Sequence, residues 1–519
     1  MSGSADNNKR LFKNTAILYI RMAIVMLISL YTSRVILLNL GVEDFGIYNV
    51  VCGIAILFVF INGGMGQANL RFLSRALSEN NHTEFNHIFN VSQNVHCILA
   101  LIIVLLAETV GLWFLNTKLN IPELKYHAAN WAYQFALFTC LGNILIAPYN
   151  ASIIAFEKFS FVAYSSIVLS VGKLCIALLI AKSSTEKLIF YAGLMFGLNA
   201  LIQIITVIYC KLKFSSFVKY HFCRDRILFY KLISFSGWSL CGNFADMCNS
   251  QGINMAINIF CGVACNAAWG IANQVNGAIY QFVTNFQTAF RPQILKLYGD
   301  KTHDEFINLV IQSSKLSYWL MLFLALPLCL NLDWILSVWL KVVPPYTKGF
   351  VLCIIANSIV DSVSAPLWMS IQANGNIQKY QVIISSFYIS SLLVSIAVLA
   401  CGLSPVVAIA SKAFINFCSF IWRIFFLQNR IGISAKFFLI QVCLRVVIVT
   451  IVATLLPVAI YFTTINMNGL NRILISGAVS CISIALCIYC LGLKNHEREY
   501  IINFIKSKTN IFLYRKKKI

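Results

Sequence analysis

The sequence has few charged residues for its length, and this shortage decides the class of protein. Only 11% of the 519 residues are Asp, Glu, Lys or Arg, whereas 59% are hydrophobic and the mean hydropathy is +0.78. A soluble domain carries roughly 25% charged residues, so the composition excludes a soluble globular chain. The apolar runs are long and continuous, unlike the short alternating segments of an outer-membrane barrel. We therefore predict an all-α polytopic membrane protein.

Acidic residues are scarcer still. The chain has 18 Asp and Glu against 40 Lys and Arg, which gives a net charge of +22 at pH 7. Most of the basic residues lie in short loops and at the termini, and about 28 of the 40 fall on one side of the predicted membrane. This distribution indicates contact with anionic lipid headgroups and does not suggest nucleic acid as a partner. We expect an inner-membrane protein with both termini in the cytoplasm.

Catalytic and metal-binding motifs are absent. No Gly-rich phosphate loop, His-Glu metal motif or nucleophile elbow occurs in a suitable context, and the 18 cysteines include no Cys-x-x-Cys pair. No external loop exceeds about twenty residues, which leaves no room for a folded extracytoplasmic domain. We therefore predict that the protein is not an enzyme and has no cofactor or metal site. A coupling ion, H+ or Na+, is left open.

Fourteen apolar runs are long enough to cross a hydrocarbon core of about 30 Å as helices. They are 14–40, 45–66, 87–115, 131–156, 160–181, 187–211, 232–260, 268–291, 314–338, 349–371, 381–402, 404–428, 437–463 and 470–493. We group them into two six-helix bundles and an appended pair. The predicted domains are a first bundle at 1–211, a basic cytoplasmic linker at 212–231, a second bundle at 232–430, helices 13 and 14 at 431–493 and a basic cytoplasmic tail at 494–519.

A short internal repeat supports the two halves. Each half has a Gly-Val turn, then an aromatic-Gly-Ile helix start, then a Gln-x-x-x-Arg exit. The first copy is Gly41-Val42, Phe45-Gly46-Ile47 and Gln67 to Arg71, and the second is Gly262-Val263, Trp269-Gly270-Ile271 and Gln287 to Arg291. Both turns are predicted to face outward and both Arg inward, so the repeat is parallel.

Two consecutive apolar runs, 232–260 and 268–291, each carry a row of polar residues on one helical face. The rows are Asn243, Asp246, Ser250, Asn254 and Asn258, and then Asn273, Gly277, Tyr280 with Gln281, Thr284 and Thr288. An unpaired amide in hydrocarbon costs several kcal/mol, so these rows face protein or water. Two interpretations stay open: hydrogen bonding between packed helices, or a hydrated cavity for a polar substrate.

Charges at membrane depth are the remaining candidates for function. Lys173 and Lys412 lie near the middle of their runs, whereas Arg21, Arg34 and Arg445 lie nearer an end and can also snorkel to an interface. Positive residues at this depth suit an anionic substrate, and the planar fork of Arg suits phosphate. The deep acids Asp246 and Asp361 either neutralise a buried cation or accept a coupling ion.

The stretch from Leu40 to Val51, together with Arg71-Phe72-Leu73-Ser74, resembles the opening of bacterial polysaccharide biosynthesis proteins of the O-antigen and capsule flippase type. These belong to the multidrug/oligosaccharidyl-lipid/polysaccharide (MOP) superfamily. The resemblance implies a V-shaped pair of bundles whose cleft carries an undecaprenyl-diphosphate-linked oligosaccharide to the periplasmic leaflet. It places substrate contacts at Arg21, Arg34, Arg71 and Arg291, with Lys173 and Lys412 as additions. The first polar row, with Asn243 and Asn254, would face sugar hydroxyls, and Gln281 of the second row is a further candidate for substrate binding.

Two other functions stay open beside the flippase. A cation-coupled multidrug exporter of the same superfamily would favour acidic, aromatic-lined pockets, whereas basic residues exceed acidic ones at depth here. A membrane glycosyltransferase or polysaccharide polymerase is disfavoured by the short loops and the repeat. As a flippase, the protein is expected to contact membrane lipids and other polysaccharide assembly proteins.

Overall fold

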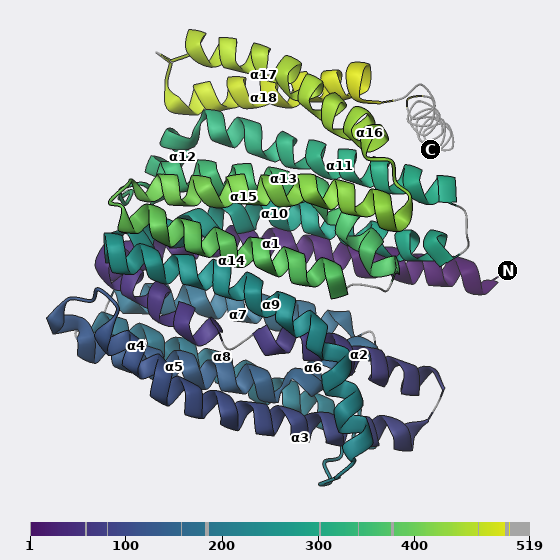
Figure 1. Ribbon diagram of the computed structural model, residues 1–519. Coiled ribbons are helices and arrows are strands. Elements are labelled where there is room, and N and C mark those ends of the chain that lie inside the picture. The colour runs from purple at the N-terminus through teal and green to yellow at the C-terminus, as the bar shows by residue number, and fades with distance from the viewer. Residues whose placement is uncertain are drawn as a thin grey trace, which may run out of the picture. The chain divides into compact units, whose positions relative to one another are not determined.

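The computed structural model describes residues 2–57, 60–79, 81–156, 158–181, 186–299, 303–340, 342–374, 378–465, 467–493 and 498. Every regular element in these ranges is a helix, which confirms the predicted all-α class (Figure 1). For some helical residues, including 2–23 and 231–241, only the backbone is described. The predicted tail at 494–519 lies outside the described residues apart from position 498.

The helices follow one another with short connections. In the first part of the chain they are α1 (Ser2–Leu57), α2 (Phe60–Ser78), α3 (His82–Leu106), α4 (Leu112–Thr117), α5 (Tyr126–Leu145), α6 (Ala147–Ala155), α7 (Phe159–Ile180) and α8 (Lys187–Lys213). They continue as α9 (Arg226–Cys261), α10 (Val263–Gly299), α11 (His303–Leu330), α12 (Leu332–Leu340), α13 (Thr347–Asn374), α14 (Gln378–Ala400), α15 (Pro405–Ile431), α16 (Ala435–Phe438), α17 (Arg445–Thr463) and α18 (Gly469–Cys487).

The described residues of the fourteen predicted apolar runs are almost all helical, but the run 45–66 is divided between the end of α1 and the start of α2. Some spans consist of two joined elements: π-helical turns at Ala107–Gly111 and Leu439–Leu444 join α3 to α4 and α16 to α17. Ten helices in the described ranges are long and apolar enough to cross a membrane, or eleven if α5 and α6, bent by 44°, form one span. The chain is therefore a multi-pass membrane protein.

Two compact units divide the chain. Unit 1 comprises 1–275, 336–354 and 377–415, and unit 2 comprises 276–335, 355–376 and 416–519. In unit 1, α1 packs on α5 and α7, and α9 packs on α2 and α14. Its apolar core includes Ile47, Val50 and Val51 of α1 against the small residues Ala128, Ala129 and Ala132 of α5. The predicted domain boundaries stay a prediction.

The internal repeat has a backbone counterpart in unit 1. Gly41 has φ 84° and ψ 169°, and Gly262 has φ 80° and ψ 179°. This conformation is accessible almost only to glycine, because a side chain would clash with the backbone. Both Gly-Val turns therefore redirect the chain in the same way, one inside the long α1 and one between α9 and α10.

The glycines of the two aromatic-Gly-Ile motifs let α1 and α10 approach each other closely. A Cβ added at Gly46 would overlap the backbone carbonyl of Val263, at the start of α10. In return, a Cβ at Gly270 of α10 would lie 2.7 Å from the side-chain nitrogen of Asn49 on α1. Backbone atoms cannot move aside as a flexible side chain can, so this crossing requires glycine at position 46. The repeated motif is thus a packing motif.

In unit 2, α11 packs on α17 and α18, which are the predicted appended pair. The Tyr318 hydroxyl lies 2.7 Å from the Thr450 hydroxyl, and the Asn331 amide donates to Ser476 Oγ at 2.9 Å. Between the pair itself, Ser483 donates to the carbonyl oxygen of Ala453 at 2.9 Å. Hydrogen bonds from polar side chains, to side chains and to a backbone carbonyl, thus hold these lipid-embedded helices together.

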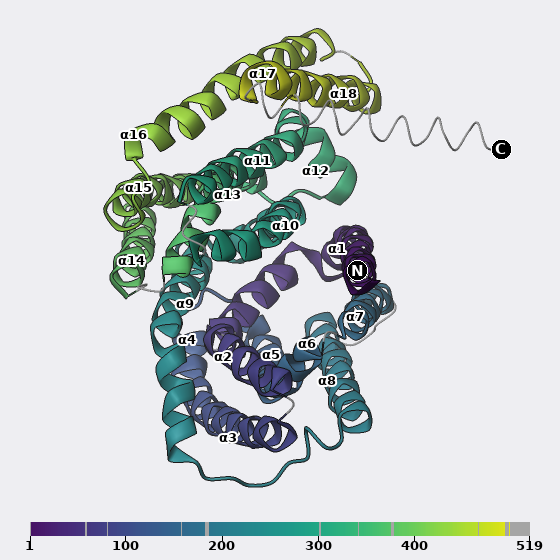
Figure 2. The ribbon, with the colours of Figure 1, turned by 90° about the vertical axis from the view of Figure 1, so that its right-hand side faces the viewer.

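The segment between α8 and α9 lies along α3 in unit 1 (Figure 2). It is shorter than the predicted linker because α9 begins at Arg226, before the predicted start of the apolar run at residue 232. Asp225 caps this helix, since its Oδ1 accepts a hydrogen bond from the Leu228 amide at 3.0 Å. An N-cap aspartate satisfies one of the free amides of the first turn.

Candidate substrate-binding and coupling residues

The polar stripe of α9 consists of two parts. Asn254 is buried; its amide donates to the carbonyl oxygen of Asn49 at 3.3 Å and its Oδ1 accepts from the Asn266 amide at 2.8 Å. Asn258 is also buried, and its Oδ1 accepts from the backbone amide of Asn120 at 2.8 Å. This end of the stripe fastens α9 to its neighbours in unit 1. A substrate role for Asn254 stays a prediction.

The other part of the α9 stripe is more open. Asn243 is half-buried, and Asp246 is exposed in the structure. Asp246 lies close enough to Lys412 of α15 to interact with it electrostatically. The Lys412 ammonium in turn lies 5.7 Å from the centroid of the Trp269 ring, within cation–π distance. An acid, a cation and an aromatic ring thus gather in one part of unit 1, from three different helices.

Lys173 of α7 lies in different surroundings. Its side chain is half-buried, and it lies near enough to Cys52 of α1 to interact electrostatically. In the described part of the chain, no hydrogen bond or ion pair joins Lys173 to another residue. Arg34 is also half-buried, but its Nη1 donates to the carbonyl oxygen of Val338 at 3.1 Å. The protein therefore provides a hydrogen-bond acceptor for the charge of Arg34, whereas the described residues provide none for Lys173.

The structure does not describe the side chains of three of the predicted arginines. Those of Arg21, Arg71 and Arg291 lie outside the described part of the structure, although their backbones are helical. Gln281 of α10 is exposed, and its Nε2 donates to Asn285 Oδ1 at 3.2 Å. Gln281 therefore remains accessible on the surface of unit 2.

Asp361 of α13 is the centre of a polar network in unit 2. Its two carboxylate oxygens accept hydrogen bonds from the amides of Asn357 and Asn416, each at 2.9 Å. The neighbouring Ser358 hydroxyl donates to Asn276 Oδ1 at 2.7 Å. Asn357 Oδ1 is buried and makes no hydrogen bond. Both carboxylate oxygens accept hydrogen bonds from amide nitrogens, so a cation would bind here only if the amides turned their oxygens toward the carboxylate. A coupling-ion role for Asp361 stays a prediction.

Two deep cations were missed by the sequence interpretation, both in unit 2. Lys315 of α11 is only 1% exposed, and its ammonium lies 5.6 Å from the Trp319 ring centroid. Arg423 of α15 is also buried, and it donates to the carbonyl oxygen of Ser364 at 3.4 Å. The apolar run 314–338 places Lys315 at its edge, but α11 already begins at His303. The position of the helix start therefore decides the depth of Lys315.

No metal cluster accompanies these residues: among the residues with described placement, no group of three or more His, Cys, Asp or Glu is arranged to hold a metal ion. The cysteines in the same ranges are free thiols.

Comparison with known proteins identifies the fold. No protein-family model matches the sequence, and no curated protein matches it significantly. The lipid II flippase MurJ, in an inward closed conformation, matches with a TM-score of 0.64 and 14% identity over 92% of this chain and 98% of MurJ. The MATE multidrug transporter DinF-BH matches with a TM-score of 0.63 and 15% identity, over 82% of this chain and 96% of its own.

An inward-facing multidrug resistance MATE family transporter of the MOP superfamily also matches, with a TM-score of 0.59 and 12% identity over 80% of this chain and 99% of its own. All three are named as transporters or flippases. Their coverage spans nearly the whole length of each matched protein, so the likeness is not confined to one bundle. The chain has the fold of MOP superfamily transporters and flippases.

Proposed function

We propose that the protein is a flippase that moves an undecaprenyl-diphosphate-linked oligosaccharide from the cytoplasmic to the periplasmic leaflet by alternating access. The oligosaccharide would be a repeat unit of O-antigen, capsule or exopolysaccharide. The fold supports this proposal, because it is shared with a protein named as a lipid II flippase over 92% of the chain. The stretch from Leu40 to Val51 supports it through its resemblance to polysaccharide flippases.

The main support for the proposal is the charge of Lys173, which the described residues do not compensate. A cation inside a membrane protein is costly unless a counter-charge or hydrogen bonds compensate it, and deep charges accordingly mark substrate pathways. Lys412 has Asp246 nearby and Arg34 has a carbonyl oxygen, but the described residues provide no such partner for Lys173. An anionic ligand would provide the missing charge, and the diphosphate of the lipid carrier has the right sign.

A cation-coupled multidrug exporter is the second candidate, and two observations favour it. The fold is also that of MATE multidrug transporters. The carboxylate of Asp361, surrounded by amides, and the exposed Asp246 would attract cations. Under this alternative, Lys173 is not needed for transport.

The test is translocation of a fluorescent undecaprenyl-diphosphate oligosaccharide in proteoliposomes under an imposed H+ or Na+ gradient. Lys173→Met removes the charge and keeps the length of the side chain. Lys158→Met is the matched control, because Lys158 is exposed at the start of the same helix α7. We expect transport by the wild type and the control, and at least a tenfold loss in Lys173→Met.

Two results would contradict the proposal: the first contradicts the role of Lys173, and the second contradicts the flippase itself. Equal transport by Lys173→Met and wild type would remove the cation from the mechanism. A wild type that moves no such lipid but exports a cationic dye under the same gradients would favour the drug exporter. The gradient that supports transport identifies the coupling ion, H+ or Na+.

We also propose an inner-membrane location with both termini in the cytoplasm, where the basic loops would contact anionic lipids. A fluorescent protein fused after residue 519 that folds only in the cytoplasm tests this orientation. Fluorescence supports it, and a dark fusion of a full-length, membrane-inserted protein contradicts it. Co-purification from a native membrane tests the expected polysaccharide assembly partners.

A further inference from the structure

The segment 214–225, called here the strap, lies along one face of α3 in unit 1 (Figure 2). Three asparagines at steps of four residues on α3 bond its backbone. Four helical residues rise about 6 Å, and two extended residues span about 6.6 Å. Successive asparagines can therefore bond alternate residues of the strap. The bonds are Asn86 Nδ2 to the carbonyl oxygens of Phe217 (3.0 Å) and Lys219 (2.8 Å), the His221 amide to Asn90 Oδ1 (3.0 Å), and Asn94 Nδ2 to the Cys223 carbonyl oxygen (2.8 Å).

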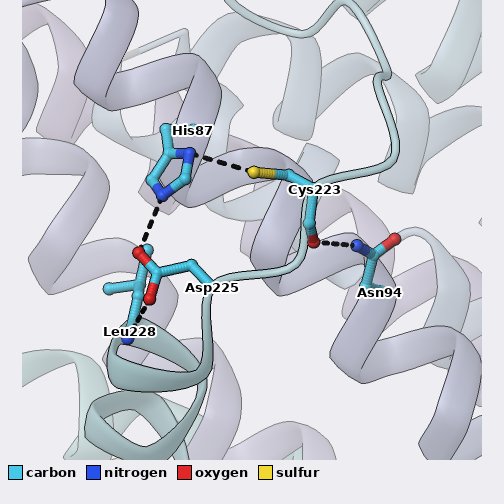
Figure 3. A network of polar contacts seen from close by, with 5 residues as sticks. All are labelled: His87, Asn94, Cys223, Asp225 and Leu228. Atoms are coloured by element: carbon cyan, nitrogen blue, oxygen red, sulfur yellow. Dashed lines mark hydrogen bonds and ion pairs between the residues drawn. The ribbon is translucent and has the colours of Figure 1, made fainter.

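At the end of the strap, a thiol, an imidazole and a carboxylate form a continuous chain (Figure 3). Cys223 Sγ lies 3.2 Å from His87 Nδ1, and His87 Nε2 lies 3.0 Å from Asp225 Oδ2. One tautomer satisfies both contacts: Nδ1 accepts the thiol proton, and Nε2–H donates to the carboxylate. This is the order of groups that activates a cysteine nucleophile, with a base beside the thiol and a third group that orients the base.

Each group is held by a separate contact. Asn94 holds the carbonyl of Cys223, and the other oxygen of Asp225 caps α9. His87 lies on α3 beside Asn86 and is oriented by Cys223 and Asp225 themselves. The site is also accessible, since the side chains of His87 and Asp225 are 40% and 33% exposed and Cys223 is half-buried. Cys223 packs in part against the apolar residues Ala68 and Val91, but it is half-buried and not enclosed by them.

We propose that Cys223 is an activated thiol that exchanges with low-molecular-weight disulfides. His87 takes the thiol proton, the thiolate attacks one sulfur of the disulfide, and a mixed disulfide forms while the other half leaves as a thiolate that regains a proton. The cysteine sulfur is oxidised and the leaving thiol is reduced, so the electrons balance. Three basic residues near the thiol in sequence, Lys219, Arg224 and Arg226, favour an anionic disulfide such as oxidised glutathione.

The proposal does not depend on the transported substrate. It has a structural consequence within unit 1, because a mixed disulfide removes the proton donor to His87 and places a bulky group between α3 and the strap. The exchange would therefore loosen the end of the strap next to the first turn of α9. Reduction by a thiol would restore the contact.

The first experiment measures alkylation of the full-length protein in detergent by iodoacetamide between pH 5.5 and 9. Trypsin cleaves after Lys219 and Arg224, so the peptide Tyr220–Arg224 reports Cys223 alone by mass spectrometry. We expect the folded protein to react at least about tenfold faster at pH 6.5 than the same thiol in the denatured protein, since a histidine partner stabilises the thiolate. The advantage over the denatured protein should shrink toward pH 9, where the thiol of the denatured chain also ionises.

Two variants separate activation from simple exposure. His87→Ala removes the base, and His87→Gln keeps a donor toward Asp225 but cannot take the proton. Both should lose the tenfold advantage and regain the pH profile of the denatured chain. If one variant fails to fold, the other variant and the wild-type profile still decide the matter. A wild-type rate equal to that of the denatured chain, or variants with an unchanged profile, would overturn the activation.

The second experiment uses oxidised glutathione as the probe. We expect one glutathione on the Tyr220–Arg224 peptide, removed by dithiothreitol, before any other cysteine of the protein is modified. Cys223→Ser should take up no glutathione under the same conditions. Fast alkylation without a mixed disulfide at Cys223 would overturn the exchange reaction.

Discussion

The two units use polar residues inside the membrane in different ways. In unit 1, the contacts that hold α9 and α10 on α1 consist of neutral amides, backbone carbonyls and a close approach of backbone at Gly46. In unit 2, α13 and α15 meet at the carboxylate of Asp361, which takes hydrogen bonds from two asparagines. A neutral network keeps its hydrogen bonds at any pH and ionic composition, whereas one built on a carboxylate depends on a proton or cation.

This difference suggests a division of roles. The helix crossing in unit 1 is suited to staying fixed, and the network in unit 2 is suited to responding to a coupling ion. The largest effects of substitution are expected at the fixed crossing.

The largest effect is expected from Gly46→Ala. The added Cβ overlaps the backbone carbonyl of Val263, so α1 and the start of α10 must separate. We expect the free energy of unfolding to fall by about 3 kcal/mol, the upper range for an overpacked site. Thermal unfolding in detergent measures the loss. Gly66→Ala in α2 is the matched control, because nothing lies within 4 Å of its added Cβ, and it should be neutral or slightly stabilising. Equal stability of the two variants would contradict a close crossing.

Asn254→Ala should have the next largest effect. It removes the buried hydrogen bonds of its side chain to the Asn266 amide and the Asn49 carbonyl, which costs about 2 kcal/mol; the Asn266 amide keeps its bond to the backbone carbonyl at position 254. Asn273→Ala tests the stripe of α10 in the same assay. Asn273 is exposed and bonds only within its own helix, to the carbonyl oxygen of Trp269, so its removal should change stability by less than about 0.5 kcal/mol. A larger loss of stability in Asn273→Ala than in Asn254→Ala would contradict the packing role of Asn254 and favour a role in ligand binding.

The same contrast shows what the sequence can predict. Polar residues at steps of three and four correctly place Asn254 and Asn258 on one helix face, because that spacing follows from helix geometry. Periodicity does not say which element covers a face. Asn254 meets Asn49, which lies 205 positions away, and only the fold brings them together. The spacing of the polar residues alone therefore could not decide between helix packing and a hydrated cavity.

Local signals were sufficient elsewhere. The apolar runs and the Gly-Val turns can be recognised from residues close together in the sequence. The structure confirms the helical runs and the fold. His87 and Asp225, in contrast, are separated by 138 positions and belong to no sequence motif. An N-cap aspartate before α9 was the one signal available there, and it predicts a helix start, not a histidine partner.

Asp361→Asn tests the unit 2 side of the comparison. An asparagine can accept a hydrogen bond at only one of its two terminal atoms, so one of the two amides now bonded to Asp361 loses its acceptor. We expect a loss of about 1–2 kcal/mol in the free energy of unfolding. Asp246→Asn is the unit 1 counterpart; because Asp246 is exposed, its loss should stay below about 0.5 kcal/mol. A larger effect at Asp246 would show that unit 1 also depends on a carboxylate.

The smallest effect is expected outside the membrane, at Asp225. The hydrogen bond from His87, and then that from the Leu228 amide, lower the pKa of Asp225 from its ordinary value of 3.8. A carboxyl with a lowered pKa stabilises the folded state above its unfolded pKa, and this stabilisation is lost as the pH falls through the folded value. Asp225→Asn keeps a capping side chain and removes the charge, so it should be slightly less stable than wild type at pH 7.

This deficit should shrink as the pH falls below about 4, where the wild-type carboxyl also becomes neutral. Thermal unfolding of both proteins from pH 7 to pH 3 measures it. A deficit that stays constant to pH 3 would mean that the asparagine weakens the cap of α9 itself and that the His87 contact contributes nothing. A deficit that disappears on acidification locates the contribution in the charged carboxylate that accepts from His87, the same contact that orients His87 toward Cys223.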